Sequence, residues 1–239
     1  MKFGIIAAGL GSRLTKEGIE TPKPLVRLNG EPLIGRLMRI FCENGAETIT
    51  VVINSDMPEV GEYIREFSKI SECPIKLVVK STPSSMHTFK VLVDAMEIEG
   101  KFVVTTVDTV FQERNFREYI KSFNSSPDSI NGIMGVTPFI DDEKPLYVKV
   151  DDKDLITAFS DNSFDGVKYI SAGIYGLTPA CIKVLDSCIQ NNVSRMRNYQ
   201  RALIDSGLRI KAFDIGKVID VDHVSDIRTA EQFISSDKR

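Results

Sequence analysis

The chain has 239 residues, a net charge of −3 and a hydrophobic content of 42%, values that are ordinary for a folded protein with a sizeable core. The slightly acidic balance provides no global basic field, so we expect no nucleic-acid partner. The apolar runs are strand-sized rather than membrane-sized, a signal-peptide pattern is missing, and the four cysteines include no C-x-x-C pair, so we expect a cytoplasmic protein with reduced thiols and no membrane partner.

The first part of the chain alternates short apolar runs with helical patterns. The predicted strands are Phe3–Ala7, Thr48–Ile53, Ile75–Val79, Phe102–Thr106 and Gly132–Val136. The predicted helices are Pro32–Asn44, Pro58–Lys69, Met86–Met96 and Glu113–Phe123. Strands separated by helices predict right-handed crossovers and an α/β fold with a mostly parallel sheet, in which ligands bind at the carboxyl ends of the strands.

The pattern changes after Val136. The sequence then predicts a hairpin, a strand, two helices, a further strand and a final helix that begins within Val218–Phe233. The first five elements are Tyr147–Asp161, Tyr169–Leu177, Pro179–Gln190, Asn198–Asp205 and Ile210–Phe213. We expect one domain over residues 1–239, composed of halves 1–136 and 137–239, with a small β insertion in the second half.

The first loop has the pattern of a phosphate-binding turn. The run AAGLGSRL (Ala7–Leu14) follows the first strand, and seven residues separate Leu14 from PKPL (Pro22–Leu25). Gly9 and Gly11 carry no Cβ, so backbone N–H groups can approach phosphate oxygens closely. Arg13 and Lys23 would add cationic donors near the same phosphates. The pattern therefore favours a bound nucleoside triphosphate.

A dinucleotide-binding turn is the alternative interpretation of the two glycines. The Rossmann fingerprint requires a third glycine where Leu14 stands. It also requires an acidic residue after the second strand, but Ile53 is followed by Asn54 and Ser55. The triphosphate interpretation is therefore preferred.

The glycine-rich run, PKPL and LNGEPLI (Leu28–Ile34) together resemble the signature of sugar-1-phosphate nucleotidyltransferases, the NDP-sugar pyrophosphorylase-like family with a GT-A-like fold. The resemblance implies a Rossmann-like, three-layer α/β/α fold. It implies Mg²⁺-dependent transfer of a nucleoside monophosphate from an NTP to a phosphorylated acceptor, with release of pyrophosphate. Arg13 and Lys23 are the implied catalytic residues. The implied nucleotide-binding residues of the first loop are Ala7, Ala8, Gly9, Leu10, Gly11, Ser12, Arg13 and Lys23.

Two acidic residues match metal-ligand positions of that family. Asp108 follows the apolar strand Phe102–Thr106, where an aspartate could alternatively cap a turn. In VIDVDHVSDIRTAEQF, Asp222 best matches the second ligand, which the resemblance places in the half 137–239, and Asp220 is the alternative. Asp222 could instead serve only as a helix N-cap. Mg²⁺ prefers a few carboxylates together with water and phosphate oxygens.

Ser84 and Ser85 lie where the family places its base-contacting loop, although they could be helix N-caps alone. The surrounding sequence also resembles a pattern of choline-phosphate cytidylyltransferases, so the base and the acceptor stay open at this point.

The acceptor side has a weaker signature. The strand SAGIYGL resembles the family's sugar-pocket strand, which implicates Ala172, Gly173 and Tyr175. The usual Glu-Lys-Pro is replaced after Phe159, so the acceptor's phosphate needs another cation. Lys149 and Lys168 are candidates.

Three functional hypotheses follow. The leading one is a sugar-1-phosphate nucleotidyltransferase of nucleotide-sugar biosynthesis, with an NTP and a small phosphorylated acceptor as partners. The second is a cytidylyltransferase that acts on phosphocholine or a similar alcohol phosphate. The third is a catalytically inactive nucleotide-sensing module of the same fold. The oligomeric state is left open by the sequence.

Overall fold

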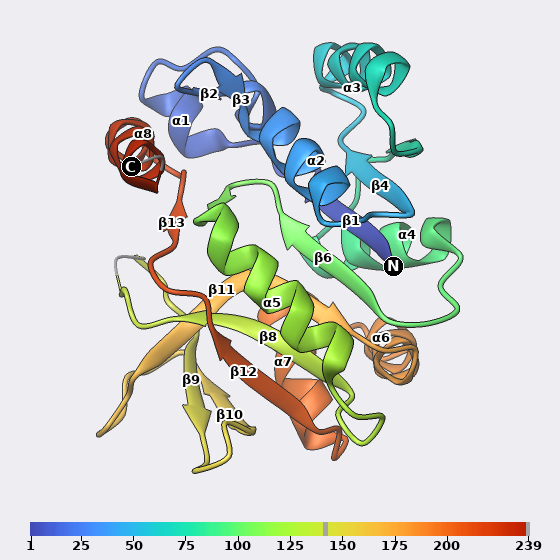
Figure 1. The fold of residues 1–239 in the computed structure, drawn as a ribbon, viewed down its shortest axis with the longest axis vertical. Helices are drawn as coiled ribbons and strands as arrows, with labels where there is room; N and C mark the ends of the chain where they lie inside the picture. Colours follow the sequence, from blue (N-terminus) through green and yellow to red (C-terminus); the bar gives the residue numbers. More distant parts are fainter. Residues whose placement is uncertain (141–142, 238–239) are drawn as a thin grey trace.

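A central nine-stranded sheet runs through the computed structural model, which describes residues 1–140 and 143–237 (Figure 1). The strands of this sheet are β1 (Lys2–Ala7), β4 (Thr48–Ile53), β5 (Ile75–Val79), β6 (Phe102–Thr106), β8 (Gly132–Thr137), β9 (Tyr147–Val150), β10 (Ile156–Ser160), β11 (Tyr169–Leu177) and β12 (Ile210–Asp214). Strands β5, β4, β1 and β6 are adjacent and parallel. Strand β11 lies antiparallel between β6 and β8, and β12 pairs parallel with β8. The sheet is thus mixed, and its parallel portion is formed by β5, β4, β1 and β6.

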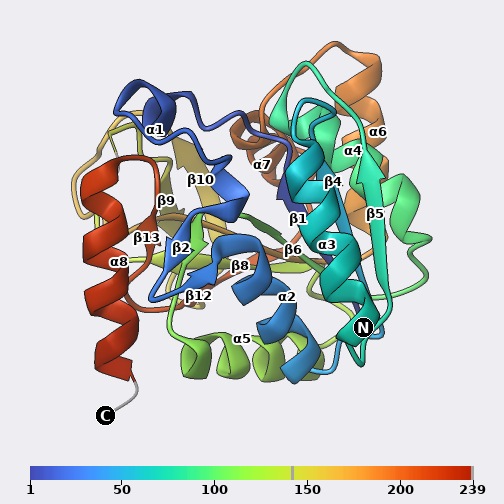
Figure 2. The same ribbon diagram turned by 90° about the horizontal axis from the view of Figure 1, so that it is seen from above.

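Helices cover both faces of the sheet, which gives three layers (Figure 2). The longer helices are α2 (Leu33–Glu43), α3 (Pro58–Ile70), α4 (Ser85–Met96), α5 (Glu113–Ser125), α6 (Ala180–Gln190), α7 (Met196–Asp205) and α8 (Val224–Asp237). One apolar core contains residues of α2, α3, α5 and α8, and the other contains residues of α4, α6 and α7. In β1, Phe3 and Ile5 face the first core and Ile6 the second, because successive side chains of a strand alternate. Burial on both faces explains the nearly continuous apolar sequence of this strand.

A short antiparallel pairing joins two segments that are distant in sequence. Strand β7 (Thr109–Val110) pairs with β13 (Ile219–Asp220), and the Val221 N–H donates to the Asp108 carbonyl over 3.1 Å. This contact brings the chain after β6 next to the chain before α8. Because the pair is antiparallel, Asp108, just before β7, lies beside the segment that follows β13.

The predicted α/β fold with a mostly parallel sheet is confirmed, and the bounds of the long elements agree with the prediction within a few residues. The predicted hairpin forms β9 and β10, which pair with each other, and β9 extends the sheet beside β11. The sequence did not predict the shortest elements. These are α1 (Ser12–Lys16), a 3₁₀ turn (Lys23–Leu25), the pair β2 (Arg27–Leu28) and β3 (Glu31–Pro32), and the pair β7 and β13. Among the described residues, none of the helices is long and apolar enough to cross a bilayer.

Candidate active site

The glycine-rich loop connects the end of β1 to the short helix α1. Gly11 immediately precedes α1 and has a φ of +63°, a conformation that side chains with a Cβ rarely adopt. A Cβ at Gly11 would also lie 2.8 Å from the Cβ of Lys23. Glycine is therefore required here by both the backbone and the space, and the loop lies directly against the Lys23 side chain.

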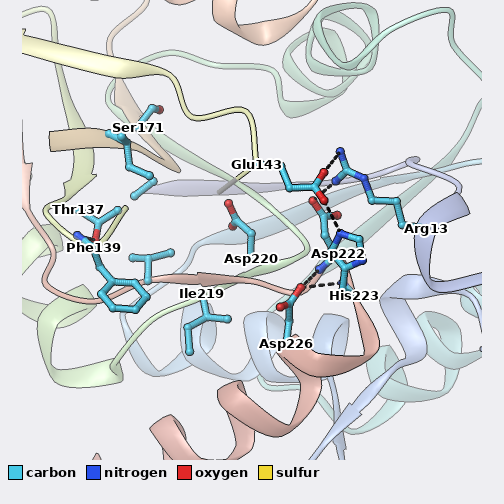
Figure 3. Close-up of a pocket in the computed structure, with 13 residues that line it drawn as sticks. Arg13, Thr137, Phe139, Glu143, Ser171, Ile219, Asp220, Asp222, His223 and Asp226 are labelled. Carbon is cyan, nitrogen blue, oxygen red and sulfur yellow. Dashed lines mark hydrogen bonds and ion pairs between the residues drawn. The ribbon is translucent and has the colours of Figure 1, made fainter. Parts of the chain in front are cut away.

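Lys23 lies between two carboxylates at the carboxyl end of the sheet. Its Nζ atom is 2.5 Å from Oδ2 of Asp108 and 2.6 Å from Oδ1 of Asp222. Arg13 contacts the other oxygen of Asp222, with Nη1 2.5 Å from Oδ2 (Figure 3). Four of the residues proposed from sequence thus form one connected cluster, and the Lys23 side chain is only 7% exposed.

The electrostatics of this cluster favour charged groups in spite of burial. Burial lowers the pKa of Lys23, but the attraction of Asp108 and Asp222 outweighs it, so the net pKa is raised. Burial likewise raises the pKa of Asp108, and Lys23 outweighs that effect, so the net pKa is lowered. Lys23 and Asp108 are consequently both ionised at neutral pH.

The two carboxylates fit a divalent cation. Asp108 and Asp222 each direct an oxygen at the same ammonium nitrogen, so the position between them already accommodates a positive charge. No group of three or more His, Cys, Asp or Glu residues that could hold a metal occurs in residues 1–140 and 143–237. Two carboxylates are nevertheless a suitable protein contribution for Mg²⁺, which completes its coordination with phosphate oxygens and water.

Asp220, the alternative ligand, has a different environment. Its Oδ1 accepts a hydrogen bond from Thr109 Oγ1 over 3.3 Å, within the β7 and β13 pair. Thr109 also bonds Thr106, with 2.6 Å between the hydroxyl oxygens. The contacts with Lys23 and Arg13 belong to Asp222, so the geometry favours Asp222 over Asp220.

The turn before α8 is held by acidic side chains. Asp226 Oδ2 accepts hydrogen bonds from the backbone N–H groups of Asp222 and His223, over 3.0 and 2.7 Å. Glu17 accepts one from the Val224 N–H over 2.8 Å and contacts His223 Nδ1 at 2.5 Å. These bonds fix the Asp222 backbone. Asp222 is not merely a cap, since its carboxylate pairs with Lys23 and Arg13.

Glu143 lies beside Arg13 and His223 (Figure 3). Its carboxylate lies 3.6 Å from Arg13 and 3.2 Å from His223 Nε2. Sequence analysis missed Glu17 and Glu143, because an isolated glutamate in a polar loop carries no pattern.

One cavity collects most of the predicted nucleotide-binding residues. It is lined by Ile6, Ala8, Gly9, Gly11, Ser12, Arg13, Lys23, Thr82, Ser84, Ser85, Thr88, Thr106, Val107, Asp108 and Asp222. Two predicted residues do not line it. Ala7 is fully buried in the core at the end of β1, and the Leu10 side chain is 59% exposed.

Ser84 and Ser85 join this cavity to the start of α7. Ser84 precedes α4 but makes no side-chain cap bond to that helix. Its hydroxyl instead contacts His87 Nδ1 at 2.8 Å and accepts from the Arg195 N–H at 3.4 Å. Ser85 accepts a hydrogen bond from the Met196 N–H over 3.2 Å. Ser84 thus occupies the N-cap position of α4, but its side chain does not cap the helix.

A second cavity adjoins the first at Asp108 and Asp222. Its lining residues are Ser85, Thr106, Asp108, Lys144, Leu146, Ser171, Gly173, Tyr175, Arg195, Met196, Arg197, Gln200, Asp220 and Asp222. Two predicted acceptor residues, Gly173 and Tyr175, lie here, whereas Ala172 lines a neighbouring cavity beside Asp220. Gly173 has a φ of +69°, and a Cβ there would lie 2.6 Å from Thr109 Oγ1.

The two candidate lysines do not line this second cavity, which we call the acceptor cavity. Lys149 is exposed on β9, and Lys168 is exposed with its ammonium over the Tyr169 ring. The cations in the cavity wall are instead Lys144, Arg195 and Arg197. Sequence analysis missed them because they lie in loops and at a helix start that no motif marks.

Arg195 and Arg197 differ in what they contact. Arg197 is paired with Asp161, with 2.5 Å between Nη1 and Oδ1, and it also donates to the Lys144 carbonyl over 2.9 Å. Arg195 is exposed and has an unusual backbone, with φ 71° and ψ 138°. Within residues 1–140 and 143–237 its guanidinium makes no ion pair or hydrogen bond.

The chain is similar to known families and proteins. Residues 4–156 match the model of the MobA-like NTP transferase domain. The bifunctional IPC transferase and DIPP synthase of Archaeoglobus fulgidus is 25% identical over 99% of this chain and 44% of its own length. The glucose-1-phosphate cytidylyltransferase of Salmonella typhimurium is 30% identical over 46% of this chain and 39% of its own length. The chain thus spans less than half of either relative.

The fold is also similar to that of solved structures. The inositol-1-phosphate CTP transferase of T. maritima superposes with a TM-score of 0.82, covering 100% of this chain and 96% of that chain at 21% identity. The family match extends from β1 through the loop, Lys23 and Asp108 to β10. The expected relationship to nucleotidyltransferases is confirmed, and the chain belongs to the MobA-like NTP transferase domain family.

Proposed function

We propose that this chain transfers a cytidylyl group from CTP to a sugar or cyclitol phosphate, with release of pyrophosphate. The observation that carries the proposal is the cluster of Lys23, Arg13, Asp108 and Asp222 at the junction of two cavities. One cavity begins at the glycine-rich loop and the other at the acceptor strand β11. A reaction that joins two substrates requires this arrangement.

The reaction is an in-line displacement. An acceptor phosphate oxygen attacks the α-phosphorus, a new P–O bond forms, and the bond between the α-phosphorus and the bridging oxygen breaks as pyrophosphate leaves with the electron pair. Asp108 and Asp222 would hold a Mg²⁺ ion, which would supply charge neutralisation of the phosphates. No side chain has to act as nucleophile, so the contribution of the protein is positioning and electrostatic stabilisation.

Lys23 and Arg13 change partners in this scheme. In the structure both cations contact carboxylates. If Asp108 and Asp222 held a divalent cation, the Lys23 ammonium and the Arg13 guanidinium would be available to the phosphates of CTP. Gly9 and Gly11 leave the backbone of the loop open toward the same phosphates. The cluster is therefore an exchangeable set of ion pairs, in which substrate and metal replace contacts within the protein.

The cytidine preference is supported by the relative from Salmonella typhimurium, whose name states this base. The base would lie toward Thr82, Ser84 and Thr88, which line the nucleotide cavity. Thr82 and Thr88 bond each other, with 2.6 Å between the hydroxyl oxygens. Their polar surface suits the carbonyl and amino groups of a pyrimidine.

Arg195 is the residue that we assign to the acceptor's phosphate. Asp161 forms an ion pair with Arg197 and also contacts Arg201 Nη2 at 2.5 Å. Arg195 retains its donors for a ligand, and a guanidinium binds phosphate in a bidentate manner. Its backbone N–H bond to Ser84 links the acceptor side to the nucleotide side.

The test is pyrophosphate release across four NTPs and three acceptors, namely glucose 1-phosphate, inositol 1-phosphate and phosphocholine. We expect turnover with CTP and one or both of the hydroxylated phosphates. The Asp108→Asn variant should lose at least ~10²-fold in turnover, the effect of removing one preorganised electrostatic contact. Absence of pyrophosphate with every pair would contradict the proposal, and nucleotide binding without turnover would favour the sensing module instead.

A further inference from the structure

The acceptor cavity contains a buried amide that lacks a partner for its donor. Gln200 lies on α7, is only 2% exposed and still lines this cavity. Its Oε1 accepts a hydrogen bond from Ser171 Oγ over 2.9 Å. Its Nε2 has no hydrogen-bond partner within residues 1–140 and 143–237.

Gln200 Nε2 is not among the fully buried side-chain atoms that lack a partner in the described residues, so this donor is accessible from the cavity. The bond from Ser171, on β11, fixes the orientation of the Gln200 amide oxygen and leaves the NH₂ group without a partner among the described residues. The donor is thus held in place for a group that enters the cavity.

The neighbouring groups define the chemistry of that ligand. Ser171 and Tyr175 add hydroxyls to the same cavity wall as Gln200. A hydroxyl group on the ligand can accept from the Gln200 amide and donate to the Ser171 oxygen, so it satisfies both. A quaternary ammonium can do neither.

We propose that Gln200, oriented by Ser171, binds a hydroxyl group of the acceptor and thereby selects a polyhydroxylated phosphate over an alkylammonium phosphate. This inference rests on the proposed function and deepens it. Both residues line the same cavity, so Arg195 can hold the phosphate while Gln200 recognises the hydroxylated body of the acceptor. Sites that hydrogen-bond a substrate hydroxyl reject analogues without it, because the polar groups of the site are then left unpaired.

The test compares wild type with Gln200→Met, which keeps the length of the side chain and removes the amide. Initial rates are measured with CTP and Mg²⁺ against glucose 1-phosphate, inositol 1-phosphate and phosphocholine. We expect the KM of the preferred hydroxylated acceptor to rise about tenfold, with a smaller change in kcat and an unchanged KM for CTP. The matched control is Gln190→Met, since Gln190 is exposed on α6 away from both cavities.

Two further measurements separate recognition from misfolding. Thermal melting and CTP binding without acceptor should match wild type in Gln200→Met. Monodeoxy analogues of the preferred acceptor should include one that wild type uses about tenfold less well, and the Gln200→Met variant should no longer discriminate against that analogue.

The outcomes distinguish this inference from the proposed function. If wild type transfers the nucleotide to phosphocholine in preference to both hydroxylated phosphates, the inference is wrong and nucleotidyl transfer stands. An acceptor KM within twofold of wild type in Gln200→Met would also overturn it. If the wild-type protein turns over none of the acceptors, both the inference on Gln200 and the proposed function are wrong.

Discussion

Replacing Lys23 by methionine removes the ammonium from the cluster and keeps most of the side-chain volume. Asp108 and Asp222 would then face each other without the cation that both contact, at 2.5 and 2.6 Å. The variant should therefore be less stable without metal, bind divalent cations more tightly and turn over more slowly. These three effects have one cause, because the ammonium and the metal compete for the same two carboxylates.

The expected loss of stability follows from the exposure of the groups. Removing one partner of a buried ion pair costs about 3–5 kcal/mol. Asp108 and Asp222 are 27% and 34% exposed, so solvent screens them in part and the lower end of that range applies. About 3 kcal/mol corresponds to a fall in Tm of roughly 6–12 °C for a chain of this size.

The assay is thermal melting in EDTA and across an Mg²⁺ titration, with Mn²⁺ binding followed by electron paramagnetic resonance. We expect Lys23→Met to melt lower in EDTA, to recover part of the loss with Mg²⁺ and to bind Mn²⁺ more tightly than wild type without nucleotide. Turnover should fall at least ~10²-fold. Lys16→Met, an exposed position on α1, should behave as wild type. An unchanged Tm in EDTA, or weaker Mn²⁺ binding, would refute the competition between ammonium and metal.

Three other substitutions test separate parts of the site. Gly11→Ala forces a Cβ into a conformation with φ +63° and should cost about 1–2 kcal/mol of unfolding free energy and most of the turnover, whereas Gly100→Ala, with no atom near its Cβ, should preserve activity. Arg195→Gln should raise the acceptor KM at least tenfold and leave the KM for CTP within twofold, with the exposed Lys168→Gln as control; equal effects of the two would contradict the assignment. Asp161→Asn should lower the Tm by an amount that is constant from pH 5 to 7. Burial raises the pKa of Asp161, but its arginine partners lower it by more, so the net pKa in the folded protein is below 3.8. The stability that Asp161 contributes is therefore present above pH 3.8 and is lost as the pH falls through the lower folded pKa. A Tm difference that widens below pH 3.8 would contradict this.

The long elements were predictable because their apolar patterns are determined by burial. Thr48–Ile53 and Phe102–Thr106 are strands with the predicted bounds, since both are buried on two faces of the sheet. The start of α1 was not predictable in this way, because Gly11 and Ser12 were interpreted only as parts of a phosphate-binding loop. The two-residue strands β7 and β13 are too short to show a period.

The site likewise contains residues that a sequence pattern indicates and residues that only the structure reveals. Arg13, Lys23, Asp108 and Asp222 follow strands or lie at fixed distances from glycines, so their residue types and spacing indicated a shared role. Arg195 and Gln200 reach the cavity through the packing of α7 against the sheet, and only the structure reveals this contact. Asp161 illustrates the limit most clearly. The sequence around Asp161 shows that the expected Glu-Lys-Pro lysine is missing. It does not show that Asp161 pairs with two arginines of α7.

The measurement that tests the central claim most directly is product analysis by ³¹P nuclear magnetic resonance. CTP, Mg²⁺ and a hydroxylated acceptor phosphate are incubated with the protein, and the signals of CTP, product and pyrophosphate are followed together. The account predicts a diphosphate-linked product and pyrophosphate in equal amounts, with neither formed by Asp108→Asn over the same period. Consumption of CTP to CDP and inorganic phosphate, or no consumption at all, would contradict it.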